Sequence, residues 1–472
     1  MAEPPVKVEH RRRARERVVV HVDTLAARWV GALALLIAAS WLTVLVVRSY
    51  RHANWDADGR LAWSLTILAA VALISRGIFL GRPVTAAHAI AAAGALLAGF
   101  AAHILAFDVP GNFLIASSGL ALMWPTTARP QPDQLPRVWA LVNATEGDPV
   151  APFAMQMLKS YFYSADGTAA IAYRTRLGYA VVSGDPIGDE RRYEELVGDF
   201  VAMCHSRGWR VLVLGCSQFR LGLWRNPELI GQRLRPVPIG RDVVIDVQTF
   251  DMVGRRFRNL RQAVQRTHNF GITTEIVAEQ DLDEGRLAEL TDVLLSSAKG
   301  ARTERGFSMI LDATLTGHYP GVLLIIARDR AGTVQGFHRY VVAGRGSDYS
   351  LDVPWRRPGA PNGIDERLSV DMISAAKKAG AQRLSLAFAA FPEIFNDSER
   401  GPLSSFFYAA IHLGDSLIAL ESLYRYLRKF HALGDRRYVL LPLAQVLPVL
   451  VVLLSLEFAP RRRQLPTVSA SG

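Results

Sequence analysis

Long uncharged runs near the N-terminus constrain this chain more than any other feature of its sequence. Residues 26–125 carry only nine charged side chains, whereas residues 126–472 carry 78. A helix rises about 1.5 Å per residue, so an apolar run of about twenty residues is long enough to cross the hydrocarbon core of a bilayer. The charge distribution therefore predicts a membrane-embedded segment followed by a soluble body, rather than one globular protein.

The overall composition excludes two other classes of protein. Half of the residues are apolar, which is too many for an intrinsically disordered chain. Two cysteines are too few for a disulfide-stabilised scaffold, and we expect Cys204 and Cys216 to be free thiols. The sequence also lacks the G-x-S-x-G, H-E-x-x-H and C-x-x-C patterns, so we expect no metal site.

Three segments are long and apolar enough to be membrane spans, namely 27–47, 61–81 and 84–107. A fourth apolar segment, 111–125, has only about fifteen residues, which fits a short span, a re-entrant piece or an interfacial piece. Four spans would return the chain to the side of the membrane on which it starts, and three would leave the soluble body on the opposite side.

Six basic residues precede the first span and place the N-terminus in the cytoplasm by the positive-inside rule. They are Lys7, Arg11, Arg12, Arg13, Arg15 and Arg17. We expect four spans, and therefore a multi-pass protein of the cell membrane whose soluble body is cytoplasmic.

One pattern of elements occurs twice in the soluble body. Three strands, a helix and a closing strand are predicted at 161–164, 168–174, 178–183, 189–206 and 210–214, and again at 321–327, 333–343, 348–352, 364–379 and 383–388. The offset between the copies is 165 residues at Gly167 and Gly332 and 167 residues at Asp185 and Asp352. A near-constant offset through successive elements indicates an internal repeat.

The order of elements in each copy is that of the GNAT acyltransferase half-fold. The sequence therefore predicts an α/β protein in which N-terminal transmembrane helices precede a tandem GNAT-like acyltransferase fold. The Q/R-x-x-G-x-G/A loop that cradles the pyrophosphate of acyl-CoA is missing after both third strands, which disfavours an acyl-CoA donor. We expect no cofactor.

These features divide the chain into six expected segments. They are a basic cytoplasmic tail (1–25), a membrane domain of three or four helices (26–125), a linker (126–137), a first GNAT-like half (138–300), a second GNAT-like half (301–437) and an apolar C-terminal helix (438–460). Pro442 and Pro448 interrupt the last segment, which favours a helix lying on the membrane or on the body over a fifth span.

Three motifs resemble the C-terminal catalytic domain of the lysylphosphatidylglycerol synthases, the multiple peptide resistance factor family. The motifs are GYAVVSGDPIG (178–188), FRNLRQAVQRTHNFGI (257–272) and YSLDVPWRRPGAPNGID (349–365), and the resemblance covers roughly residues 138–440. It implies a tandem GNAT-like pair that transfers an aminoacyl group from aminoacyl-tRNA to a hydroxyl of phosphatidylglycerol on the cytoplasmic side. The amino acid, lysyl or alanyl, stays open, as does the oligomeric state.

Such a transesterification needs a base for the hydroxyl proton, a cation for the tetrahedral oxyanion and a carboxylate for the amino group. We predict Asp352 as base or amine anchor and Arg356 as the cation that steadies the oxyanion or a phosphate. Further candidates for substrate binding are Asp185, Arg357, Asn362, Gly363 and, by resemblance, Lys429. Asp185 is more plausibly structural, and Asn362 and Gly363 fit a helix N-cap equally well.

A basic stretch between the repeats is a candidate anion-binding surface. Residues 203–268 hold twelve arginines against four acidic residues, and 252–266 has the pattern of an amphipathic helix whose apolar stripe includes Val253. Its basic side chains suit the phosphates of tRNA or anionic lipid headgroups. They are Arg255, Arg256, Arg258, Arg261 and Arg266.

Two other functions stay open. Departures from the family pattern at Trp355 and Ala387 are compatible with a diverged, non-catalytic membrane-anchored binder of anionic lipid. A GNAT-like transferase with a different acceptor, such as a peptidoglycan precursor, is the second alternative.

Overall fold

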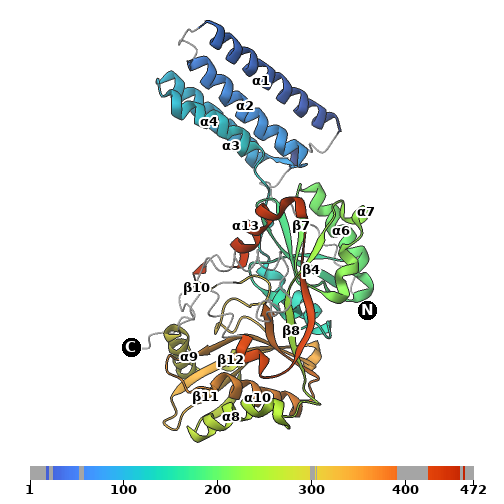
Figure 1. The fold of residues 1–472 in the computed structure, drawn as a ribbon, viewed down its shortest axis with the longest axis vertical. Helices are drawn as coiled ribbons and strands as arrows, with labels where there is room; N and C mark the ends of the chain where they lie inside the picture. The colour runs from blue at the N-terminus through green and yellow to red at the C-terminus, as the bar shows by residue number, and fades with distance from the viewer. Residues whose placement is uncertain are drawn as a thin grey trace, which may run out of the picture. The chain divides into compact units, whose positions relative to one another are not determined.

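The structure is a computed structural model of the 472-residue chain (Figure 1). It describes residues 18–20, 25–52, 58–297, 303–304, 306–390, 424–457 and 461–462. The chain divides into two compact units, of which the first comprises Met1–Thr127 with Ala202–Arg210 and the second comprises Ala128–Val201 with Val211–Gly472. Each unit is described by itself.

The first unit consists mainly of four apolar helices: α1 (Leu25–His52), α2 (Asp58–Phe79), α3 (Ala86–Ile104) and α4 (Asp108–Leu122). The first three contain segments long and apolar enough to cross a membrane, which agrees with the three predicted spans. The short strands β1 (Val18–Val20) and β2 (Val84–Thr85) pair beside them.

The fourth apolar segment is helical but has only 15 residues. It packs against α2 and α3. A Cβ atom added at Gly119 would lie 2.6 Å from the backbone oxygen of Ala70, so only glycine permits this approach. Small residues at helix contacts are typical of membrane bundles. Whether α4 spans the bilayer stays a prediction.

The second unit is built on a sheet of twelve described strands. Their bounds are β3 (Ser160–Tyr163), β4 (Ala169–Arg176), β5 (Tyr179–Ser183), β6 (Ile187–Gly188), β7 (Arg210–Ser217), β8 (Arg235–Asp246), β9 (Thr273–Ala278), β11 (Val322–Arg328), β12 (Val334–Ala343), β13 (Asp348–Arg356), β14 (Arg383–Ala390) and β15 (Leu433–Leu441). Their order is β3-β4-β5-β7-β15-β8-β14-β13-β12-β11-β9, with β6 beside β4. The ten predicted repeat elements are present within a few residues of their expected bounds.

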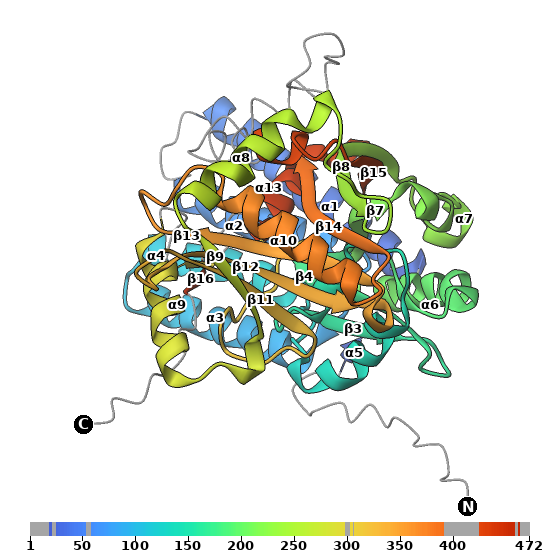
Figure 2. The same cartoon turned by 90° about the horizontal axis from the view of Figure 1, so that it is seen from below.

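Helices cover the sheet on both faces. They are α5 (Leu135–Ala144), α6 (Tyr193–Ser206), the short α7 (Pro227–Ile230), α8 (Arg258–Asn269), α9 (Glu284–Ser296), α10 (Ile364–Lys378) and α13 (Val446–Glu457). Figure 2 shows α10 lying along β11, β12 and β14, and these elements share one apolar core with α8. The two-residue strands β10 (Thr303–Glu304) and β16 (Arg461–Arg462) pair with each other.

Strand pairing corrects three expected segment boundaries. β8 pairs with β14 and β9 pairs with β11, so both belong with the second repeat although they precede residue 300. Residues 438–441, expected at the start of the C-terminal helix, instead complete β15, which lies between β7 and β8. Helix α5 begins at Leu135, inside the expected linker. Sequence periodicity predicts each element from its own residues, whereas the positions of β8, β9 and β15 in the sheet depend on strand partners far along the chain.

Candidate functional site

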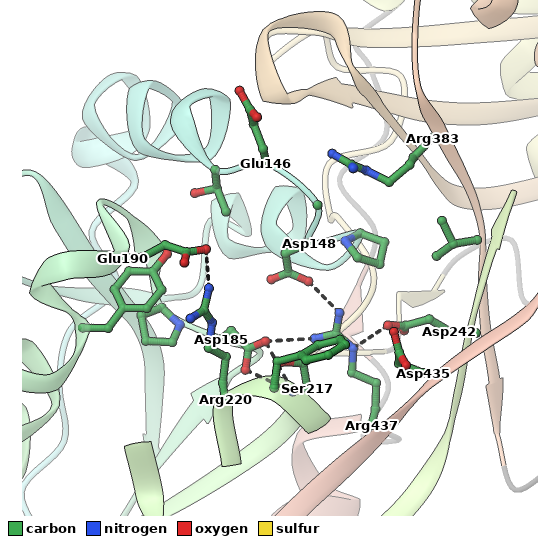
Figure 3. Close-up of a pocket in the computed structure, with 18 residues that line it drawn as sticks. Glu146, Asp148, Asp185, Glu190, Ser217, Arg220, Asp242, Arg383, Asp435 and Arg437 are labelled. Carbon is green, nitrogen blue, oxygen red and sulfur yellow. Dashed lines mark hydrogen bonds and ion pairs between the residues drawn. The ribbon is translucent and has the colours of Figure 1, made fainter. Parts of the chain in front are cut away.

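A cavity of about 280 Å³ opens between the two repeats, where β5, β7, β15 and β8 lie next to one another (Figure 3). Its apolar and aromatic lining includes Tyr193 at the start of α6 and the exposed Phe219. The charged side chains that line it are Glu146, Asp148, Asp185, Glu190, Asp242 and Asp435, with Arg220, Arg383 and Arg437. Carboxylates therefore outnumber guanidinium groups two to one.

Arg437 on β15 is the central cation of this cavity. Its buried guanidinium donates to Asp148 at 2.6 Å, to Asp242 at 2.8 Å and to Asp185 at 3.4 Å, and also to the carbonyl of Gly215 at 3.1 Å. Figure 3 shows it between the three carboxylates, which come from three separate segments of the chain. One residue thus connects the C-terminal strand to both halves of the sheet.

Burial and mutual repulsion affect the carboxylates around Arg437. Burial raises the pKa of Asp242 to about 6, although Arg437 acts to lower it. Burial also raises the pKa of Asp185, and the nearby Asp148 adds to the effect. The backbone N–H of Ser217 donates to Asp185 at 3.1 Å and partly offsets this cost.

One oxygen of the cavity lacks a partner in the described part of the chain. Asp148 Oδ1 accepts hydrogen bonds from Arg437 and from the backbone of Val150, whereas its buried Oδ2 accepts none. A buried carboxylate oxygen without a donor is costly, and an entering ammonium group would satisfy it. The excess of negative charge in the cavity favours the same kind of ligand.

Asp352, the predicted reactive carboxylate, lies in a second buried ion network. Arg339 donates to Asp352 at 2.9 Å and to Glu279 at 2.9 Å, and all three side chains are inaccessible to solvent. The backbone N–H of Leu311 donates to the other oxygen of Asp352 at 2.8 Å. Burial raises the pKa of Asp352 to about 6 against the opposing effect of Arg339. Asp352 does not line the cavity around Arg437.

The structure places Asp352 and Arg356 on opposite faces of β13, because a β-bulge separates them. Leu351 and Val353 oppose the consecutive residues Tyr340 and Arg339, so Asp352 is an extra residue in β13. Side chains four apart on a regular strand share a face, and one extra residue reverses this. Arg356 instead pairs with Asp365 of α10 at 3.2 Å.

The remaining predicted substrate-binding residues are spread over the second repeat. Arg357 pairs with Asp292 at 2.6 Å, and Lys429 pairs with Glu366. Gly363 is the N-cap of α10, with a φ of 101° and no space for a Cβ atom, which would lie 2.5 Å from the backbone oxygen of Ala263. The exposed Asn362 precedes it. Gly363 therefore sets the close approach of α8 and α10.

The expected basic helix is present as a short 3-10 turn (Arg255–Phe257) followed by α8. Leu260 and Val264 face the core, but Val253, expected in the apolar stripe, is exposed because it precedes the first helical turn. The five arginines are all exposed. Arg261 donates to the carbonyls of Met252 and Gly254 and holds the loop before the helix.

Sequence reasoning missed the residues that organise both ion networks. They are Asp148, Asp242 and Arg437 around the cavity and Glu279 and Arg339 around Asp352. Asp148, Asp242, Glu279 and Arg339 stand in no motif with a characteristic spacing. Only strand pairing brings Arg437 beside Asp148, which it follows by 289 residues.

Comparisons with known proteins agree with this architecture. Residues 139–441 match the family described as phosphatidylglycerol lysyltransferase, C-terminal. An MprF-like domain protein of Mycobacterium tuberculosis is 68% identical over 462 residues, which is 98% of this chain and 96% of that protein. A lysylphosphatidylglycerol biosynthesis bifunctional protein LysX of the same species is 27% identical over 90% of this chain, but the match spans only 34% of LysX.

Two solved structures have a similar fold. The C-terminal domain of a putative lysylphosphatidylglycerol synthetase from Agrobacterium fabrum has a TM-score of 0.58 at 19% identity, over 70% of this chain and 99% of that one. The structure of L-PGS from Bacillus licheniformis has a TM-score of 0.56 at 19% identity, over 69% and 96% of the two chains.

Proposed function

The chain belongs to the phosphatidylglycerol lysyltransferase C-terminal family, a family of transferase enzymes that act on a membrane lipid, and on this premise we propose a specific reaction for it. In this proposal the protein is a membrane-bound aminoacyltransferase. It moves an aminoacyl group, lysyl or alanyl, from aminoacyl-tRNA to a hydroxyl of phosphatidylglycerol or a related lipid. The observation that carries the proposal is the family match over the duplicated acyltransferase half-fold, in a chain with three candidate membrane spans.

The reaction balances without a cofactor. The lipid hydroxyl oxygen forms a bond to the acyl carbon, and the ester bond between that carbon and the tRNA ribose breaks. The proton of the lipid hydroxyl passes to a base and then to the ribose oxygen that leaves. The predicted base stays Asp352, whose pKa of about 6 leaves it ionised at neutral pH; the lipid hydroxyl would have to enter the closed network in which the Asp352 side chain is inaccessible to solvent. Arg356 lies on the opposite face of β13 and pairs there with Asp365, so it does not reach an oxyanion beside Asp352, and only its predicted contact with a substrate phosphate stays open.

The cavity around Arg437 suits the amino group of the aminoacyl ester. It offers six carboxylates against three guanidinium groups and one buried carboxylate oxygen without a donor among the described residues. An ammonium group prefers such surroundings, because carboxylates accept its hydrogen bonds and balance its charge. This assignment extends the predicted role of Asp185 in substrate binding to Asp148.

The departure from the family pattern at Trp355 gives little support to the non-catalytic alternative. That side chain is buried and packs with Phe337, Leu290 and Val293 in the core between the sheet and α9. A departure from the family pattern at a core position changes packing rather than the chemistry of a site. Ala387 lies on β14 near the undescribed segment 391–423, and its position does not distinguish the enzyme from the non-catalytic binder.

Lipid analysis tests the proposed reaction. Membranes of a host that expresses the chain should contain a phosphatidylglycerol-derived lipid carrying an amino acid, and membranes with the empty vector should not. Purified protein in lipid nanodiscs should transfer a radiolabelled aminoacyl group from tRNA to lipid, and ribonuclease treatment should abolish the transfer. Binding of aminoacyl-tRNA without any product would contradict the enzyme and favour the non-catalytic binder.

The basic helix gives a separate prediction about the donor. Replacing Arg258 or Arg266 by alanine should weaken tRNA binding, and the slope of log affinity against log salt should fall by about one for each phosphate that the variant no longer neutralises. The partly exposed Arg286 on α9 pairs with Glu275, and its replacement serves as the control. A variant that loses affinity for anionic vesicles but retains its affinity for tRNA would assign the helix to lipid headgroups instead.

A further inference from the structure

Helix α13 is apolar on both its buried and its exposed side. Val449, Val452, Leu453 and Leu456 are buried against the sheet in a core cluster that includes residues of β5, β7 and β15. The helix has 12 residues, about 18 Å at the usual rise, whereas a bilayer core is about 30 Å thick. A helix this short, with one side packed on a sheet, does not span a membrane.

The other side of this segment presents an apolar stripe. Leu443, Leu447 and Val451 are 49%, 71% and 57% exposed and lie four residues apart, so they fall along one line of the helix surface. Glu457, the only charged residue between 442 and 457, turns inward. Its carboxylate accepts hydrogen bonds from the backbone N–H groups of Phe307 and Ser308 at 3.0 Å each. The exposed stripe therefore has no charge of its own.

The length of the chain restricts what can cover this stripe. Nine residues, 123–131, join the last apolar helix to the first turn of the second unit, and fully extended they reach about 30 Å. The candidate spans hold the chain in a bilayer, so a lipid surface stays within reach of the second unit at high effective concentration. Three arginines follow at 461–463, and anionic headgroups attract each basic residue near the surface.

We propose that Leu443, Leu447 and Val451 form an interfacial anchor, by which the second unit rests on an anionic bilayer surface. The stripe enters the boundary between headgroups and acyl chains, as amphipathic segments with large apolar side chains do. Its consequence for lipid transfer rests on the proposed function: the anchor would hold the acyltransferase unit at the depth of the acceptor headgroups.

Spin labelling of the full chain in nanodiscs of phosphatidylglycerol and phosphatidylethanolamine tests the anchor. Labels on Leu447→Cys and Val451→Cys should collide often with oxygen and rarely with a water-soluble nickel complex. A label on Leu295→Cys, an exposed apolar position on α9, should show the reverse. Cys204 and Cys216 are buried and burial raises the pKa of both thiols, so the unmodified chain gives a low labelling background.

Each other outcome overturns the proposal. Free access of the nickel complex to residues 447 and 451 means that the stripe faces water. Protection from both reagents means that another part of the chain covers it, and dipolar coupling between labels means that a second copy does.

A charged variant separates the anchor from the proposed reaction. Leu447→Glu changes an exposed side chain and should leave the melting temperature unchanged, while lipid product formation in nanodiscs falls several-fold. If the spin labels enter the lipid but Leu447→Glu does not change the amount of lipid product, the anchor is confirmed and its role in transfer is overturned. If the wild-type chain makes no lipid product at all, the proposed function is overturned. The spin labels would still show whether the stripe enters the lipid.

Discussion

Replacing Arg437 by alanine should destabilise the second unit by about 3–5 kcal/mol, the usual cost of removing one partner from a buried ion cluster. Arg437 contacts Asp148, Asp185 and Asp242 and donates to the carbonyl of Gly215. Without it, three carboxylates would repel one another where water hardly enters. Urea unfolding of the full chain in detergent measures the decrease in stability.

The destabilisation by Arg437→Ala should be smaller in acid. Arg437 lowers the pKa values of Asp185 and Asp242 against the effect of burial, so its removal should raise both further. The folded variant would then bind more protons than the unfolded chain, and its stability would rise as the pH falls from 7 to 5. The exposed Arg235 on the adjacent strand β8, changed to alanine, should cost no more than about 0.5 kcal/mol. Equal stability of wild type and Arg437→Ala at pH 7 would contradict the central role of this cation.

Changing Asp352 to asparagine should slow lipid product formation by about 100-fold or more. An amide keeps the size of the side chain but does not accept the proton of the attacking hydroxyl, and general base catalysis contributes roughly this factor. Burial raises the pKa of Asp352 to about 6, and the base acts when deprotonated. The wild-type rate should therefore rise as the pH passes upward through about 6, and the variant should lack this rise. Product formed per amount of folded protein between pH 5 and 8 is the measurement.

Glu279→Gln is the matched control for the Asp352 experiment. It removes one negative charge from the same buried network, since Arg339 pairs with both carboxylates. A purely structural role of the network predicts similar losses in both variants. The proposed base predicts that Glu279→Gln loses stability but retains a rise of the rate with pH, shifted to lower pH because the Glu279 charge helps to raise the pKa of Asp352. Asp352→Asn working at the wild-type rate would rule out the base assignment.

The repeat made much of the fold predictable from sequence. Alternating apolar residues, turn glycines such as Gly167 and Gly332, and one helical pattern per copy locate ten elements within a few residues of their observed bounds. These signals are local, because strand alternation and turn conformation depend on a few neighbouring residues. Pairing of β8 with β14 is not local, and the expected boundary at residue 300 failed for that reason.

The candidate site was only partly predictable. Asp185 and Asp352 were identified because each follows the same strand of its repeat, and both are buried in ion networks. The contacts of their partners Arg437 and Arg339 could not be predicted, because the residues around these arginines come from distant segments. The bulge at Asp352 is also invisible in sequence, since a strand with one extra residue has the same composition as a regular one.

The position of β15 has a consequence for how the protein is made. This strand is synthesised after all the other described strands of its sheet, yet it lies between β7 and β8 in the middle of that sheet. Until it emerges from the ribosome, the facing edges of these two strands lack their final partner, and open strand edges invite pairing with other chains. A chain that stops before Leu433 would retain both repeat motifs and lack the strand that joins them. Premature termination should therefore produce aggregation-prone fragments rather than smaller working enzymes.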